Sequence, residues 1–268
     1  MYSGWPDLKA FELVGPFTSV SSTPASGVGA FISRLETLAV SRAEYESPED
    51  LQGADHRVLY HFFAAIGGMS SQALNLTRLE LQGLKFAFLG GGPTFMSIGT
   101  HLLHAVNFCR LHVLSIQGCW DSELLVTGIK EQFEKGKPML RRLTFAMKLF
   151  DRSEFLHLNS LLLCFEGLQC LRIAIHQRQD DFNSAIDPAA IINHGLTLQE
   201  LALDDMMADH FELDQLKDLI SQCPKLEQLG LVLLSSWREH FHPPDYLDWE
   251  TEKPIDEYLV SSGRYSYG

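Results

Sequence analysis

Residues 198–203 read LQELAL, and residues 226–231 read LEQLGL. In both stretches apolar residues stand at the first, fourth and sixth positions, and the residues between them are polar or small. Side chains of a strand point alternately to its two faces, so positions four and six share one face. The pattern therefore predicts a short strand that buries positions four and six and leaves positions three, five and seven uncovered.

The same pattern occurs eight times along the chain. The first residues of the eight copies are Leu8, Leu35, Leu76, Leu111, Leu140, Leu168, Leu198 and Leu226. The steps between successive copies are 27, 41, 35, 29, 28, 30 and 28 residues, so the last four steps are nearly constant. Such a period indicates a repeat architecture, and the two long steps predict insertions.

Segments between the strands have the spacing of amphipathic helices. One apolar stripe that is expected on a single helix face consists of Leu124, Leu125, Ile129 and Phe133. Asp187 followed by Pro188 predicts a helix start, with a capping carboxylate and a proline at the first helical position. Pro224 predicts the end of the helix that precedes it.

Each unit is thus one strand and one helix, and neither buries its apolar face within the unit. Stacked units bury a continuous core, in which each fully buried Leu contributes about 1.5–3 kcal/mol. The predicted fold is an α/β solenoid over residues 1–236, with a curved parallel sheet, helices on the convex side and about eight repeats. Residues 237–268, which are rich in Pro, Asp and aromatic residues, are expected to form a loosely structured tail.

Two stretches carry a resemblance to a known family. Residues 111–119 (LHVLSIQGC) resemble the cysteine-containing subclass of leucine-rich repeats found in F-box proteins. Residues 193–201 (NHGLTLQEL), together with residues 223–229 (CPKLEQL), are similar to fungal F-box-associated repeat proteins. The resemblance covers nearly the whole chain and implies a leucine-rich-repeat solenoid. It also implies that Cys119 packs at a corner between a strand and a helix.

In the family that the chain resembles, an F-box docks on the ubiquitin-ligase adaptor and the repeats hold the target protein. The resemblance therefore implies a non-catalytic protein-interaction module, similar to the substrate-binding repeats of a ubiquitin-ligase receptor. The first strand begins at Leu8, which leaves no room for an F-box, so the adaptor is an expected partner only if an F-box exists upstream. Two alternatives stay open: a free-standing leucine-rich-repeat scaffold without a ubiquitin role, and a truncated receptor fragment.

Composition limits the class of partner and the compartment. The net charge of −13 over 268 residues repels phosphate backbones, so we expect no nucleic-acid partner. No apolar run reaches the length of about 18 residues that a membrane helix needs, and no secretory signal is recognisable. The cysteines, which include no C-x-x-C pair, indicate reduced thiols in a cytoplasmic or nuclear protein. They are Cys109, Cys119, Cys164, Cys170 and Cys223.

No catalytic constellation is recognisable in the sequence. The run Gly90–Gly92 lacks the spacing and the lysine of a phosphate-binding loop. His101 and His104, with Cys109 nearby, could face a metal, but no carboxylate or second cysteine completes a ligand set. No cysteine or serine has the signature of a nucleophile with its base. We therefore expect no enzyme activity, no cofactor and no metal.

Candidate partner-binding residues stand on the uncovered face of the predicted sheet. Every basic residue at these positions is an arginine, whose guanidinium offers paired donors to carboxylates and phosphates. The arginines predict a site for a protein or peptide ligand that is acidic or phosphorylated. The alternative is that Arg78 and Arg142 pair with Glu80 and Glu200 within the sheet itself. The candidate residues are Arg78, Glu80, Gln82, Gln117, Arg142, Thr144, Arg172, Glu200 and Asp204.

Overall fold

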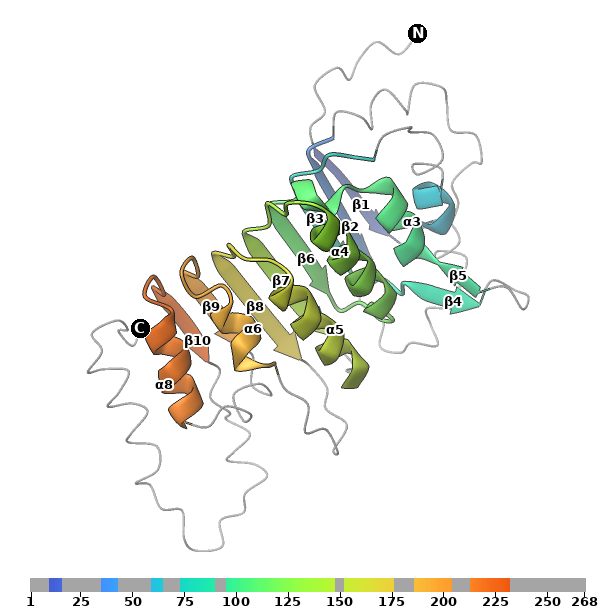
Figure 1. Cartoon of the computed structure of the whole chain (residues 1–268). Coiled ribbons are helices and arrows are strands. Elements are labelled where there is room, and N and C mark those ends of the chain that lie inside the picture. Colours follow the sequence, from blue (N-terminus) through green and yellow to red (C-terminus); the bar gives the residue numbers. More distant parts are fainter. Residues whose placement is uncertain are drawn as a thin grey trace, which may run out of the picture.

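A computed structural model of the chain describes residues 10–15, 35–42, 59–64, 73–89, 95–147, 152–175, 186–203 and 213–231. These residues form a long parallel sheet with helices along one side (Figure 1). Several features named above lie outside the described residues: Leu8, the glycine run 90–92, Asp204 and the predicted tail 237–268.

Eight parallel strands form the sheet, and their order in space follows their order in the chain (Figure 1). The strands are β1 (Ala10–Gly15), β2 (Thr37–Arg42), β3 (Arg78–Gln82), β6 (Val113–Gln117), β7 (Arg142–Met147), β8 (Cys170–Ile175), β9 (Glu200–Leu203) and β10 (Gln228–Leu231). Each strand starts at the third position of one copy of the sequence pattern. The predicted α/β fold with a parallel sheet is therefore confirmed.

The strands pair without a shift in register. Leu143 of β7 lies opposite Leu114 of β6 and Leu171 of β8. The same row continues to Leu79 of β3 and to Leu201 of β9. Because side chains alternate along a strand, a constant register places the fourth position of each copy of the pattern on the same face of the sheet.

One backbone hydrogen-bond pattern recurs where the chain enters six of the strands. The His112 carbonyl accepts bonds from the N–H groups of Arg141 (2.9 Å) and Arg142 (3.0 Å). The Arg141 carbonyl accepts in the same way from Gln169 (2.8 Å) and Cys170 (3.0 Å). The carbonyls with the same two-donor arrangement elsewhere are those of Glu36, Thr77, Gln169 and Gln199. The entries to β3, β6, β7, β8, β9 and β10 thus share one backbone geometry.

The helices between the strands lie along one face of the sheet (Figure 1). They are α3 (Ile98–Ala105), α4 (Glu123–Lys135), α5 (Arg152–Leu163), α6 (Pro188–Ile192) and α8 (Leu213–Gln222), and residues 59–64 are also helical. The predicted start of α6 is confirmed, because the Asp187 carboxylate accepts a hydrogen bond of 2.9 Å from the Ala189 N–H and Pro188 is the first helical residue. The predicted end of α8 before Pro224 is confirmed as well.

The apolar stripe that was expected on α4 was wrong at one residue. Leu125, Ile129 and Phe133 are buried, and so is Val126, but Leu124 is 53% exposed. Successive residues of a helix are turned by about 100°, so Leu124 and Val126 stand at opposite edges of the stripe. Packing against the sheet and the adjacent helices covers the edge that carries Val126.

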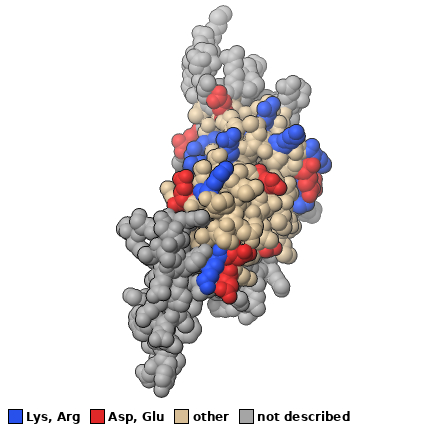
Figure 2. All heavy atoms as spheres, turned by 60° about the vertical axis from the view of Figure 1, so that its left-hand side comes forward, with Lys and Arg blue, Asp and Glu red and all other residues tan. Residues whose placement is uncertain are grey.

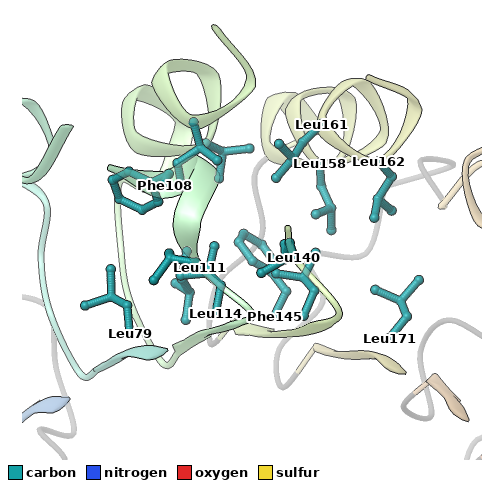
Figure 3. Close-up of a cluster of buried hydrophobic side chains, with 14 of the residues drawn as sticks. Leu79, Phe108, Leu111, Leu114, Leu140, Phe145, Leu158, Leu161, Leu162 and Leu171 are labelled. Carbon is teal, nitrogen blue, oxygen red and sulfur yellow. The ribbon is translucent and has the colours of Figure 1, made fainter. Parts of the chain in front are cut away.

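The hydrophobic core lies between the sheet and the helices. Figure 3 shows strand side chains pointing toward the helix layer: Leu171 points toward Leu162 of α5, and Leu79 points toward Phe108. Positions one, four and six of the pattern supply the strand side of this core. In the copies that contain β3, β6, β7, β8 and β9, the buried residues at these positions are Leu76, Leu79, Leu81, Leu111, Leu114, Ile116, Leu140, Leu143, Phe145, Leu168, Leu171, Ile173, Leu198, Leu201 and Leu203.

Polar side chains of one unit also bind the helix end of the unit before it. Gln132 Nε2 of α4 donates a hydrogen bond of 2.9 Å to the Leu103 carbonyl of α3. Asn193 Nδ2, which follows α6, donates to the carbonyls of Leu162 (3.0 Å) and Phe165 (2.7 Å) at the end of α5. The last carbonyls of a helix have no partner within it, so these bonds couple neighbouring units by about 0.5–1.5 kcal/mol each.

The 35-residue step between the third and fourth copies of the pattern contains an insertion, as predicted. It forms a small antiparallel sheet of β4 (Ala87–Leu89) and β5 (Phe95–Ser97), in which Phe88 lies opposite Met96. The long step between the copies predicted this insertion but not its two strands. Strands of three residues are too short to show a clear alternation of polar and apolar positions.

Candidate functional site

We call the side of the eight-stranded sheet opposite α3, α4, α5, α6 and α8 the open face. The side chains at positions three, five and seven of the pattern stand on it. In β3, for example, Arg78 and Gln82 are exposed and Glu80 is half-buried, while Leu79 and Leu81 point into the core. The open face is polar because alternation in the strands reserves the other face for apolar side chains.

The structure places the predicted binding residues, apart from Asp204, on the open face. They stand at these positions in β3, β6, β7, β8 and β9, in register with one another. They form two groups. Arg78, Glu80, Gln82 and Gln117 belong to β3 and β6, and Arg142, Thr144, Arg172 and Glu200 belong to β7, β8 and β9.

In the first group, Arg78 pairs with Glu80 of the same strand. The Arg78 Nε donates a hydrogen bond of 2.6 Å to Glu80 Oε1, and Arg78 Nη2 contacts the same oxygen. One guanidinium thus binds one carboxylate, and the pair carries no net charge. This pairing is the alternative that the sequence left open for Arg78.

In the second group, two arginines converge on one carboxylate. Arg142 Nη2 lies 3.5 Å from Glu200 Oε1, and Arg172 Nη2 donates a hydrogen bond of 3.3 Å to Glu200 Oε2. Arg142 stands two strands away from Glu200, because Cys170 of β8 lies opposite both residues in the register. The Arg142 side chain therefore reaches across β8, over a Cα separation of about 10 Å.

Cys170 is part of the second group, although it is not among the predicted binding residues. Its thiol is buried between the two charged neighbours and donates a hydrogen bond to Glu200. That hydrogen bond, together with Arg142 and Arg172, lowers the pKa of the Glu200 carboxyl. Burial, and then the bond to Glu200, raises the pKa of the Cys170 thiol. The sequence did contain a signal that Cys170 belongs to this group: it stands at the third position of its copy, as Arg142 and Glu200 do in the copies before and after it.

Polar groups also lie under the middle of the open face. Ser115, at the fifth position in β6, is only 6% exposed, and its hydroxyl accepts a hydrogen bond of 2.7 Å from Gln117 Nε2. The in-register neighbours of Ser115 are Glu80 and Thr144. A small residue at this position thus forms part of the floor of the face, with longer side chains on either side.

On the side of the molecule shown in Figure 2, charges of both signs are interspersed, and no broad block of one sign is visible. The positive charge of the second group comes from Arg142 and Arg172 themselves, so it is local to that site. A partner would meet it only after close approach, since salt screens exposed charges beyond about 10 Å.

The other chemically notable residues do not gather into a reactive site. Within the described ranges there is no group of three His, Cys, Asp or Glu side chains that could hold a metal ion. The His101 ring packs against Tyr60, with centroids 4.4 Å apart, and the Cys109 thiol donates to the Gln132 carbonyl at 3.2 Å. All five cysteines are free thiols, and burial raises the pKa of Cys119 to about 12.

His194 is buried on the core side of the sheet, in the turn between α6 and β9. Its ring lies 4.9 Å from the Phe165 ring, and the Leu168 N–H donates to its Nδ1 at 3.5 Å. Burial lowers the pKa of His194 to about 4, so the ring is neutral at pH 7. Because the His194 ring is neutral and buried on the core side, away from the open face, we assign it a structural role.

Searches against protein-family models, curated proteins and solved structures return no match to the chain. The class of this protein therefore rests on its own geometry, which is an α/β array of strand–helix units around a parallel sheet. Among the described residues, no helix is both long enough and apolar enough to cross a lipid bilayer.

Proposed function

We propose that this protein is a non-catalytic protein-interaction module, which binds its partner on the open face of a leucine-rich-repeat solenoid. One observation carries the proposal: in-register strands present one continuous surface of polar side chains interspersed with small ones, while the helices and the core occupy the other side of the sheet. A surface of this kind suits recognition of another chain, because side chains from strands far apart in the sequence act together. We take the open face to be the concave side.

Three features support the assignment to leucine-rich repeats. The repeated strand entry at six strands is expected of stacked, near-identical units. Gly83 and Gly118 stand at equivalent positions after β3 and β6, and both have positive φ, of 66° and 56°. Cys119 is fully buried at the corner after β6, where its thiol contacts the carbonyls of Leu81 (3.6 Å) and Gln117 (3.4 Å). This is the corner position that the resemblance implied for Cys119.

The resemblance also supports a narrower form of the proposal, in which the open face holds the target of an F-box ubiquitin-ligase receptor. In that case the ligase adaptor is a second partner, bound through an F-box that the transcript encodes upstream. A free-standing or truncated repeat scaffold is the alternative, with the same open face and no link to ubiquitin. The partner itself would be a protein or peptide, cytoplasmic or nuclear, and neither nucleic acid nor membrane.

Photo-crosslinking tests the binding face. A photoreactive phenylalanine analogue replaces Thr144 on the open face and, as the matched control, Leu156 on α5, which is 62% exposed on the helix side. We expect a crosslinked partner from the Thr144 position and none from the Leu156 position. The double variant Arg142→Glu/Arg172→Glu should lose that product. Equal labelling from both positions, or labelling that survives the double variant, would contradict binding at the open face.

The same experiment separates the two forms of the proposal. If the captured partner becomes ubiquitinated in a manner that depends on this protein, and the adaptor co-purifies with the product of the full transcript, the receptor form holds. If the partner is captured but neither event occurs, the protein is a free-standing scaffold. A hydrolytic or transferase activity that is lost on replacing Cys119 or His101 would contradict both forms.

A further inference from the structure

The two ion-paired groups of the open face differ in their charge balance. Arg78 and Glu80 form a pair of one cation and one anion. Arg142, Arg172 and Glu200 form a group of two cations and one anion, which leaves a net charge of +1 on an acidic protein. Only the second group has a positive charge that no carboxylate of the described residues balances by an ion pair.

The two arginines of the second group are accessible. The side chains of Arg142 and Arg172 are each 57% exposed, although both contact Glu200, which is 23% exposed. A guanidinium has five N–H donors, and one hydrogen bond, from Arg172 Nη2 to Glu200 Oε2, joins these arginines to Glu200. Each arginine therefore retains N–H donors that Glu200 does not use and that a ligand can reach.

Short side chains surround Arg172 and leave room for a ligand. Its in-register neighbours are Thr144 of β7 and Ala202 of β9, and Ala174 follows two residues later on its own strand. None of these side chains is long enough to cover the guanidinium. Arg172 therefore stands above a low floor, on which a bound chain can lie while one of its side chains contacts the arginine.

We infer that the open face between β7 and β9 binds an aspartate or glutamate side chain of a partner polypeptide, with Arg142 and Arg172 as the donors. The inference rests on the proposed function and narrows it from a surface to a chemical group. A single carboxylate restores neutrality to a group that carries +1. A phosphate monoester carries about −1.5 to −2 at pH 7, so it would exceed the available charge and be repelled by Glu200.

Glu200 thus acts as the residue that selects carboxylate over phosphate. It pairs with both arginines and so cancels one of their two charges. Replacing it by glutamine would raise the net charge of the group from +1 to +2. The Glu200→Gln variant should then accept a phosphorylated ligand that the natural protein disfavours.

A displayed library of short random peptides, selected on the whole protein, provides the probes. The best binders are resynthesised in three forms: unchanged, with each acidic residue replaced by its amide, and with it replaced by phosphoserine. Affinities are measured for the natural protein and for Arg142→Gln/Arg172→Gln, Lys135→Gln and Glu200→Gln. Circular dichroism and thermal unfolding establish that each variant is folded, which is expected because exposed ion pairs contribute little to stability.

The expected result is a peptide whose affinity falls about tenfold when one acidic residue becomes an amide. The Arg142→Gln/Arg172→Gln variant should cause the same loss, and the two losses should not add, because they remove the same contact. Lys135→Gln, which removes an exposed ion pair of α4 on the helix side, should have no effect. The phosphoserine form should bind more weakly than the acidic form to the natural protein, and at least as well to Glu200→Gln.

Other outcomes separate this inference from the proposed function. If peptides bind without needing an acid, but Thr144→Trp blocks them and Leu156→Trp does not, the open face binds partners and the carboxylate inference is overturned. Stronger binding of the phosphoserine form to the natural protein, or loss of acidic-peptide binding in Glu200→Gln, overturns it as well. If no substitution on the open face affects any selected peptide, the inference and the proposed function both fail.

Discussion

The two faces of β7 carry opposite kinds of side chain, although they belong to the same six residues. Leu143 and Phe145 are 0% and 1% exposed and pack toward the helices, whereas the Arg142 side chain is 57% exposed on the other face. Burial restricts the size and polarity of the first set, because a dense core tolerates neither cavities nor unpaired polar groups. The open face has no such restriction, so its chemistry can serve binding at little cost in stability.

Truncation on the core side should have the largest effect. Leu143→Ala is expected to lower the free energy of unfolding by about 2–5 kcal/mol, because it removes a fully buried side chain and leaves a cavity. The adjacent Arg142→Ala should cost less than about 1 kcal/mol, since it removes one exposed ion pair. Urea unfolding followed by circular dichroism measures both. Similar losses for the two variants would break the distinction between the faces.

Acidification should destabilise the core side through His194. The pKa of this residue in the folded protein is about 4, below the ordinary value of 6.5, so a proton binds the unfolded chain more tightly. The stabilisation by neutral His194 is complete above about pH 6.5 and is lost as the pH falls toward 4, for a total of about 3 kcal/mol.

Unfolding of the natural protein and of His194→Gln across this pH range measures the effect. The free energy of unfolding of the natural protein, minus that of His194→Gln, should decrease as the pH falls from 6.5 to 4, whatever the absolute stability of the variant. Parallel curves over the whole range would mean that His194 is not the group responsible.

Two glycines, Gly195 and Gly230, differ in the space that an added β-carbon would have. A β-carbon at Gly195, in the turn before β9, would collide with the Gln222 carbonyl oxygen, so Gly195→Ala should cost about 1–3 kcal/mol. Gly230 of β10 has room, since a β-carbon there would lie 3.5 Å from the nearest atom, the Ala202 Cβ. Gly230→Ala should be neutral or stabilise by up to about 1 kcal/mol, because glycine weakens a strand. Thermal unfolding compares the two, and a larger loss at Gly230 would contradict the assigned packing.

The smallest effect on stability is expected on the open face itself. Interactions that favour the charged carboxylate lower the pKa of Glu200, so their stabilisation is present above its ordinary value of 4.5 and is lost as the pH falls below it. Glu200→Gln should therefore differ from the natural protein by less than about 1 kcal/mol at pH 7, and by less still below pH 4. Urea titrations at the two pH values measure this. A difference that grows on acidification would contradict the arrangement around Glu200.

The strands and their register were predictable because their signals are local. In LQELAL, apolar residues at alternate positions specify which face of the strand is buried, and the eightfold recurrence of the pattern indicated in-order stacking. Asp187 and Pro188 marked the start of α6 through two residues that act on the same helix turn. At the candidate site, the same alternation placed Arg142, Arg172 and Glu200 on one face.

The alternation within each unit and the order of the units could thus be read from the sequence. Which edge of the α4 stripe is covered depends instead on packing in the folded protein, where Val126 is buried and Leu124 is not. It also brought Arg142 across β8 to Glu200 and enclosed Cys170 between them. These contacts depend on inter-strand register and on side-chain reach between residues far apart in the chain. Local periodicity specifies which face a side chain occupies, but not which partner it meets there.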